Sequence, residues 1–224
     1  MADPILRTIN LSKTFEIGVH KVKALRGTTI EVMPGEFIAI TGPSGSGKTT
    51  LLSLIGCLDK PTDGKIIIDS IDVTDISEAS LYRIRREKIG FIFQSFNLIQ
   101  NLSAVENVEL PMECSIKSGK QREERASELL NMVGLSGREK HRPMQLSAGE
   151  QQRVAVARAL ANSPTIILAD EPTGNLDSET GSNIIEMLRQ LPANSQCTVM
   201  MVTHDLHMAS LAGRTISLRD GMLQ

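Results

Sequence analysis

"GPSGSGKT" (Gly42–Thr49) gives this 224-residue chain its first chemical meaning. The spacing G-x-x-x-x-G-K-[ST] lets backbone N–H groups turn inward around phosphate oxygens, because glycine has no Cβ to stand in the way. Lys48 would bring a positive charge to the β- and γ-phosphates, and the Thr49 hydroxyl would ligate Mg²⁺. We therefore expect a P-loop that binds a nucleoside triphosphate through Gly42, Pro43, Ser44, Gly45, Ser46, Gly47, Lys48, Thr49 and Thr50.

The segments around this loop have the order of an α/β fold. An apolar strand, "FIAI", precedes the loop, and a helix, "KTTLLSLIGCL", follows it. After residue 160, short apolar strands alternate with helices, which indicates a buried and mainly parallel sheet. Residues 1–40 are β-rich, and "GKIIIDSIDV" predicts two strands around a turn. We expect an α/β P-loop NTPase core with a mainly parallel sheet and an N-terminal antiparallel β subdomain.

The periodicity turns helical between about 95 and 160, which predicts an inserted α-helical subdomain. "REERASELLNMVGL" places Leu129, Leu130 and Val133 on one helix face, with Gly134 as its C-cap. We expect a single domain over 1–224. The core and β subdomain would occupy about 1–94 and 161–224, and the helical subdomain about 95–160.

Composition narrows the class of protein. The net charge is −2, aromatic residues make up 3% and Trp is absent, so we expect no nucleic-acid partner.

Cys57, Cys114 and Cys197 lie far apart without a CxxC pair, which argues against a disulfide framework or a zinc site. The sequence has no apolar run of about 20 residues and no N-terminal signal core, so we expect a cytoplasmic chain.

Four polar residues follow apolar strands, at the edge where open α/β sheets bind ligands. "TIILADEP" ends in Asp170 and Glu171; Gln94 ends "KIGFIFQ" and His204 ends "VMMVTH". Beside a P-loop, Asp170 would hold Mg²⁺, and Glu171 would orient and deprotonate the attacking water. His204 would contact the γ-phosphate. In isolation, Gln94 could equally be a surface amide.

"LSAGEQQR" (146–153) has the pattern of a capped helix start. Ser147 would be the N-cap, and Glu150 would reach back to its amide, which is a capping box. A capped helix N-terminus is also an anion site, so the structural and functional interpretations are compatible.

The ordered set "GPSGSGKT", Gln94, "LSAGEQQR", "ILADEPTGNLD" and "VTHD" resembles the ATP-binding subunit of an ABC transporter over essentially the whole chain. "IGCLDKPTDG", "IGFIFQSFNL" and "ENVELPM" are most similar to the lipoprotein-release and macrolide-export group, LolD/MacB-like. The family pattern LSGGQ is replaced here by Ala148 and Glu150. Ala148 is harmless if its φ is negative, and Glu150 does little harm if it turns back to cap its own helix.

This resemblance implies further roles. Phe15 would stack on adenine, where the family usually has Tyr. Gln94 would reach the metal and the water. Asp177 would lie in the D-loop that crosses a dimer interface, and His204 would be the switch histidine. Ser147, Ala148, Gly149 and Glu150 would bind the γ-phosphate of ATP held by the partner chain.

The resemblance implies a head-to-tail homodimer that closes on two ATP and Mg²⁺ and drives a separate membrane permease of the MacB/FtsX-like type. A coupling helix of the permease would dock on about 95–115, at the inner face of the membrane. The alternatives are a non-transport ABC ATPase, serving envelope mechanotransmission, DNA repair or translation, and an unrelated P-loop kinase or GTPase. The sequence has no long coiled coil, which disfavours a DNA-repair ATPase, and no second cassette, which disfavours a translation factor. It also has no N-K-x-D motif, which disfavours a GTPase.

Overall fold

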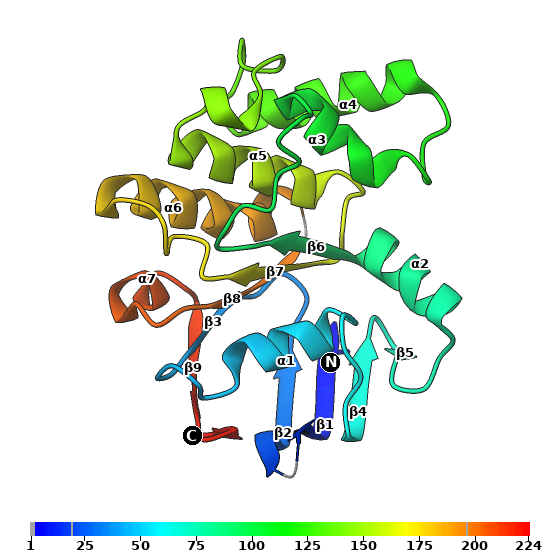
Figure 1. Cartoon of the computed structure of the whole chain (residues 1–224), viewed down its shortest axis with the longest axis vertical. Coiled ribbons are helices and arrows are strands. Elements are labelled where there is room, and N and C mark those ends of the chain that lie inside the picture. Colours follow the sequence, from blue (N-terminus) through cyan, green and yellow to red (C-terminus); the bar gives the residue numbers. More distant parts are fainter. Residues whose placement is uncertain (1–2, 19, 196) are drawn as a thin grey trace.

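The computed structural model describes residues 3–18, 20–195 and 197–224. Its strands form two sheets (Figure 1). The strands are β1 (Leu6–Ile17), β2 (His20–Val32), β3 (Phe37–Thr41), β4 (Asp63–Ile68), β5 (Ile71–Asp72), β6 (Ile89–Ile92), β7 (Ile166–Asp170), β8 (Thr198–Val202), β9 (Arg214–Arg219) and β10 (Met222–Leu223). The helices are α1 (Lys48–Ile55), α2 (Glu78–Lys88), α3 (Ala104–Glu109), α4 (Gly119–Met132), α5 (Ala148–Leu160), α6 (Ser178–Ser195) and α7 (Leu206–Ser210), with short 3₁₀ turns at Leu110–Met112 and Pro143–Gln145.

The six-stranded sheet has the order β10-β9-β3-β8-β7-β6. Its strands are parallel from β9 to β6, and only the short β10 pairs antiparallel. Every residue of β3 and β8 is buried, which is why these strands are apolar runs without alternation. The expected mainly parallel core sheet is confirmed.

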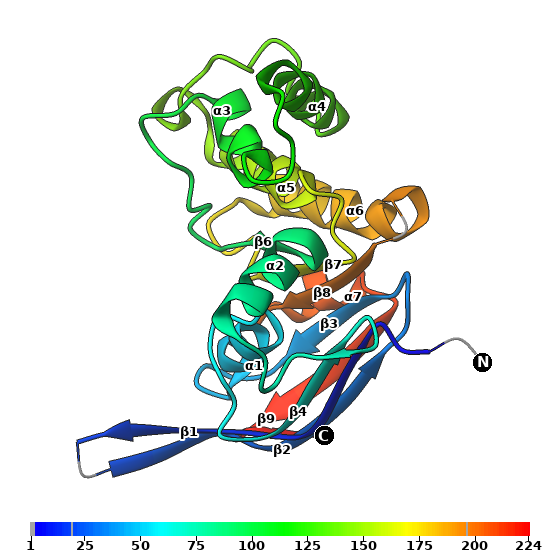
Figure 2. The same cartoon turned by 90° about the vertical axis from the view of Figure 1, so that its right-hand side faces the viewer.

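Both faces of this sheet are covered by other elements. Alternate residues of β3 point to opposite faces, and each face packs against a different core. Phe37 and Ala39 belong to the apolar core beneath α3, α4, α5 and α6. Ile38 and Ile40 belong to a second core shared with α1 and the antiparallel sheet. Figures 1 and 2 show these two layers above and below the central strands.

The second sheet is antiparallel, with the order β2-β1-β4-β5. The turn at Asp69-Ser70 has positive φ at both residues, 48° and 64°, which suits a tight hairpin between β4 and β5. The β1–β2 hairpin projects away from the body of the molecule (Figure 2). "EFIAI" forms a strand as expected, but it joins the parallel sheet rather than its chain neighbours. Helix α2 was not anticipated from the sequence.

The helical layer also follows expectation. In α4, Leu129 and Leu130 are buried, and Val133 just beyond its end is buried beside them. The C-cap is Val133 rather than the expected Gly134, which follows it with φ 74°, the left-handed conformation found just after a helix end. In the described part of the chain, no helix combines the length and the apolar character needed to cross a bilayer.

Candidate functional site

The P-loop connects β3 to α1, and two of its glycines are sterically required. Gly42 has φ 152° and Gly47 has φ 103°. A Cβ on Gly42 would collide with the carbonyl oxygen of Leu218, and one on Gly47 with that of Ala24. Gly47 is also the N-cap of α1, and within the described residues no side chain caps this helix. The first N–H groups of α1 therefore face the loop, as an anion site needs.

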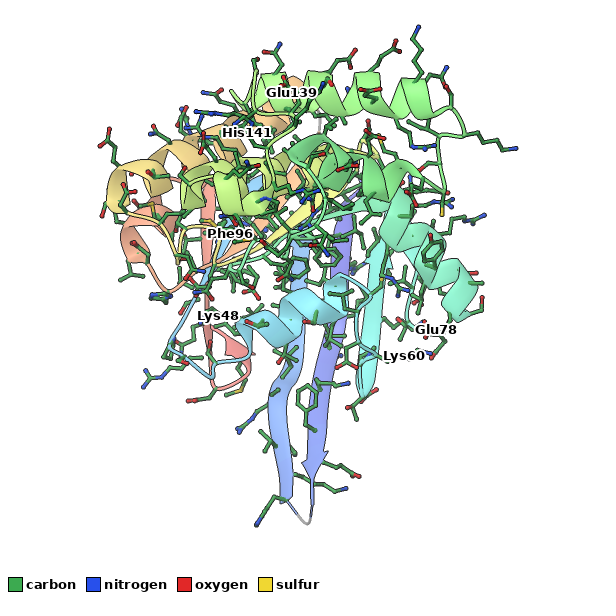
Figure 3. All side chains as sticks on the ribbon, turned by 45° about the horizontal axis from the view of Figure 1, so that its top comes forward. Lys48, Lys60, Glu78, Phe96, Glu139 and His141 are labelled. Carbon is green, nitrogen blue, oxygen red and sulfur yellow. The ribbon has the colours of Figure 1, made fainter. Side chains whose placement is uncertain are left out.

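Two polar side chains of the loop, those of Lys48 and Ser46, are buried. Lys48, at the start of α1 (Figure 3), is 8% exposed, and its Nζ donates to the carbonyl oxygens of Gly42 at 2.9 Å and Pro43 at 3.1 Å. This ammonium group therefore lies inside the loop. Ser46 Oγ is buried without a hydrogen-bond partner among the described residues, but Ser46 is not among the residues that line the nucleotide cavity described below. These features fit a bound triphosphate.

A carboxylate and a hydroxyl meet where β7 ends beside α1. Thr49 Oγ1 donates to Asp170 Oδ1 at 3.3 Å. Burial raises the pKa of Asp170, and the neighbouring Glu171 adds to this while the Thr49 hydrogen bond opposes it. Mg²⁺ prefers such hard oxygen donors and usually takes one or two carboxylates together with substrate phosphates. The donor set fits the expected metal.

Glu171 and His204 form a pair at the same sheet edge. His204 Nδ1 lies 2.9 Å from both Glu171 carboxylate oxygens. Glu171 has φ 46°, an unusual backbone conformation that is fixed because its amide donates to Val202 O at 3.0 Å. The Glu171 side chain is 16% exposed, whereas that of His204 is 68% exposed. This arrangement can hold the Glu171 carboxylate next to a phosphate, with His204 on the solvent side of that carboxylate.

One cavity of about 600 Å³ collects these groups. Its lining residues are Val22, Lys23, Ala24, Ser44, Gly45, Gly47, Lys48, Thr49, Thr50, Gln94, Asp170, Glu171 and His204. Gln94 is exposed and its side chain lies against Gly174. The structure thus brings together the P-loop and all four expected strand-end residues, although they are spread over more than 150 positions.

Gly42, Pro43 and Ser46 of the P-loop are not among the lining residues, and three further expected groups also lie outside this lining, within the part of the chain that the structure describes. Phe15 is the cross-strand partner of Val22, so its ring, 38% exposed, lies on the hairpin face next to the cavity. Asp177 accepts a hydrogen bond from the Thr180 amide at 2.9 Å and so caps the start of α6. Ser147–Glu150 begins α5 and is partly exposed.

The expected capping box at α5 is confirmed. Ser147 Oγ accepts from the Glu150 amide at 3.2 Å, and the Ser147 amide donates to Glu150 Oε2 at 2.8 Å. Ala148 is the first residue of the helix, and it is absent from the residues with positive φ. Its methyl group therefore costs no backbone strain. Gly149 lies so close to Thr180 that a Cβ there would need this side chain to move.

Sequence reasoning missed two parts of this region. Val22, Lys23 and Ala24 line the cavity from β2, and no local pattern marks them because only the tertiary fold brings β2 to the P-loop. Gln152 is fully buried and donates to Pro172 O at 2.7 Å, next to Glu171. A polar residue interrupting the apolar face of α5 was a signal that could have found it.

A second cavity, of about 500 Å³, lies between α2, β6 and the segments before and after α3, and we call it the groove. Aromatic residues and arginines line it, together with Cys114. The lining residues are Tyr82, Arg85, Arg86, Ile89, Gly90, Phe91, Phe93, Asn97, Leu110, Pro111, Glu113, Cys114, Arg158, Ala159 and Asn162.

Known proteins resemble the chain over nearly its full length. The family model described as ABC transporter matches residues 25–174. An uncharacterized ABC transporter ATP-binding protein of Thermotoga maritima is 50% identical over 98% of this chain and 94% of that protein. The macrolide export ATP-binding/permease protein MacB of Wolinella succinogenes is 45% identical over 100% of this chain, which spans 34% of that protein.

A solved structure agrees with these relatives. The dimeric, post-hydrolysis structure of the ATP-binding cassette MJ0796, bound to ADP and Pi, has a TM-score of 0.91 and 48% identity. The match covers 98% of this chain and 96% of that chain. The uncharacterized protein of that name comes from Methanocaldococcus jannaschii. The fold class expected from the sequence is confirmed.

Proposed function

This chain belongs to the ABC transporter family as an ATP-hydrolysing cassette, and we propose that it closes as a head-to-tail homodimer on two Mg²⁺·ATP to drive a separate permease. The observation that carries this proposal is the single cavity that holds the P-loop, Asp170, Glu171 and His204. We place the nucleotide-binding core in about 1–94 and 161–224, and the helical subdomain in about 95–160.

Within one cavity, each group has a task in phosphoryl transfer. Lys48 and the α1 N-terminus bind the β- and γ-phosphates, and Thr49, Asp170 and Gln94 would hold Mg²⁺. The chemistry that Mg²⁺ would supply there is positive charge that offsets the charge of the phosphates. Glu171 orients and deprotonates the attacking water, and His204, 2.9 Å from its carboxylate, holds Glu171 and faces the γ-phosphate. Phe15 stacks on the adenine from the hairpin.

In the proposed dimer, each ATP is bound by the P-loop of one protomer and by the start of α5 of the other protomer. Ser147, Ala148, Gly149 and Glu150 form a helix start outside the chain's own cavity, and Asp177 lies at another exposed helix start. A capped helix N-terminus can receive a phosphate from outside. The relative MJ0796 is a dimer with ADP and Pi bound, which supports this arrangement.

The groove is the proposed docking surface for the permease, which is of the MacB/FtsX-like type. Its aromatic and aliphatic lining with three arginines suits an amphipathic helix with an acidic or polar face. It includes part of 95–115, the region that the family resemblance assigned to docking. The relative MacB carries its ATP-binding and permease parts in one protein. Binding a permease here would hold the chain at the cytoplasmic face of the membrane.

The test is trapping the closed dimer. Glu171→Gln removes the base but keeps the shape of the site, so ATP should stay bound and uncleaved. We expect an ATP-dependent shift from monomer to dimer on gel filtration, at concentrations where ADP gives none. Lys48→Ala in the same background should abolish nucleotide binding and the shift. A Glu171→Gln chain that remains monomeric at saturating Mg²⁺·ATP would refute the sandwich dimer.

A further inference from the structure

The acid at the start of α5 is engaged on both of its oxygens. Glu150 Oε2 accepts from the Ser147 amide at 2.8 Å, and Oε1 lies 3.3 Å from Arg138 Nε. The Ser147 amide is the main reason that the pKa of Glu150 lies below its ordinary value, and Arg138 acts in the same direction. Glu150 is therefore a charged group at neutral pH, next to a helix start that must accept a phosphate.

Arg138 reaches Glu150 from a turn that is itself held in place. Arg138 N donates to Leu135 O and His141 N donates to Arg138 O, both at 3.0 Å, which closes the turn. The first amides of α3 fix its far side, because Ala104 N donates to His141 O at 2.8 Å and Val105 N to Glu139 O at 2.9 Å. Arg138 Nη1 also lies 3.2 Å from His141 Nε2. Figure 3 shows His141 and Glu139 beside the helical layer.

An acid at this position creates an electrostatic problem. The partial positive charge of a helix N-terminus attracts an anion, but a carboxylate three residues into the helix repels one. The capping hydrogen bond turns Glu150 toward its own helix without removing its charge. A guanidinium at 3.3 Å does remove the net charge, and its planar shape can also fix the orientation of the carboxylate.

We propose that Arg138 is a positioning residue of the signature, which holds Glu150 in its capping orientation and cancels its charge so that α5 can receive the partner's γ-phosphate. This inference rests on the proposed dimer. Among the described residues, Arg138 is not one of those that line the chain's own cavity. It acts through Glu150.

The first experiment measures ATP-driven dimerisation in the Glu171→Gln background. An exposed ion pair changes an equilibrium by up to about fivefold. Since a closed dimer contains two such sites, Arg138→Gln should weaken dimerisation by up to about 25-fold. ATP binding to single chains at low protein concentration should stay within about twofold. Arg189→Gln is the matched control, because Arg189 is a similarly exposed, ion-paired arginine on α6, and it should leave dimerisation unchanged.

The second experiment asks whether the effect passes through Glu150. In a Glu150→Gln background there is no charge to cancel, so Arg138→Gln should change dimerisation by less than about twofold. Arg138→Lys, which keeps the charge, should recover most of the loss. The inference would be overturned if Arg138→Gln weakened dimerisation equally with and without the Glu150 charge. It would also be overturned if this variant reduced ATP binding to single chains, or if it did not weaken dimerisation at all. Failure of the Glu171→Gln parent to dimerise would instead refute the proposed function, and the inference with it.

Discussion

Glu150 shows how one side chain can depart from a family pattern without losing the geometry. Its carboxylate occupies the place of an amide, and an amide oxygen could accept the same hydrogen bond from Ser147. We therefore expect Glu150→Gln to change ATP turnover by less than about tenfold. A steady-state phosphate-release assay with matched protein concentrations measures this change. A rise of more than tenfold would mean that the acid restrains the wild-type enzyme.

At the residue scale, a contact could be predicted from the sequence when its two residues lie close together along the chain. The Ser147–Glu150 cap and the hydrogen bonds from Lys48 to Gly42 and Pro43 join residues three to six positions apart, so a short pattern contains all the information about them. The Arg138–Glu150 pair depends on a turn that α3 holds in place, and no local pattern reports that contact. The strand-end residues were predictable because parallel strands end at a common edge, although their 2.9 and 3.3 Å distances were not.

At the element scale, α5 connects three parts of the molecule. Its start carries the signature, and Gln152 one turn later donates to Pro172 O beside Glu171. Near its end, Arg158 donates to the carbonyl oxygens of Phe96 and Asn97, in the segment that follows Gln94. A displacement of α5 would therefore reach Pro172 beside Glu171 and the groove together, and in the proposed dimer it would also reach the partner's phosphate. The sequence predicted the helix but not these links, since they join residues 20 to 62 positions apart.

Arg158 stabilises an unusual backbone. Phe96 and Asn97 have φ 60° and 51°, a conformation that costs about 1–2 kcal/mol per residue. We expect Arg158→Ala to lower the free energy of unfolding by about 2–3 kcal/mol, because two hydrogen bonds from a charged donor are lost. Denaturant titration measures this loss. Arg153→Ala is the control on the same helix, since Arg153 makes one longer bond, 3.4 Å, to Val133 O. Equal losses from both variants would contradict the role given to Arg158.

At the scale of the whole molecule, the nucleotide cavity and the groove lie on different elements and share no lining residue among those that the structure describes. They are connected through β6 and its continuation, because Phe91 and Phe93 line the groove and Gln94 lines the cavity. In the proposed complex, a permease helix in the groove would therefore press on β6, whose continuation ends at Gln94, the residue that we propose reaches the metal. This connection would give the proposed docking surface a mechanical role beyond anchoring.

The three cysteines allow this docking surface to be mapped on the intact protein. Burial raises the pKa of Cys57 and of Cys197 to about 11, so at pH 8 only about one in a thousand of each is thiolate. Cys114 is exposed in the groove. Maleimide should therefore label one thiol rapidly in the folded chain and three in urea.

Docking should then hide that one thiol. With membranes that carry the permease, labelling of Cys114 should slow by about tenfold or more, because a helix seated in the groove excludes the reagent. Arg189→Cys places a control thiol on the exposed part of α6, and its labelling rate should not change. Mass spectrometry of labelled peptides separates the two sites. Equal labelling of Cys114 with and without the permease would show that the permease binds elsewhere. The proposed coupling from the groove through β6 to Gln94 would then be refuted, because no partner would contact the groove.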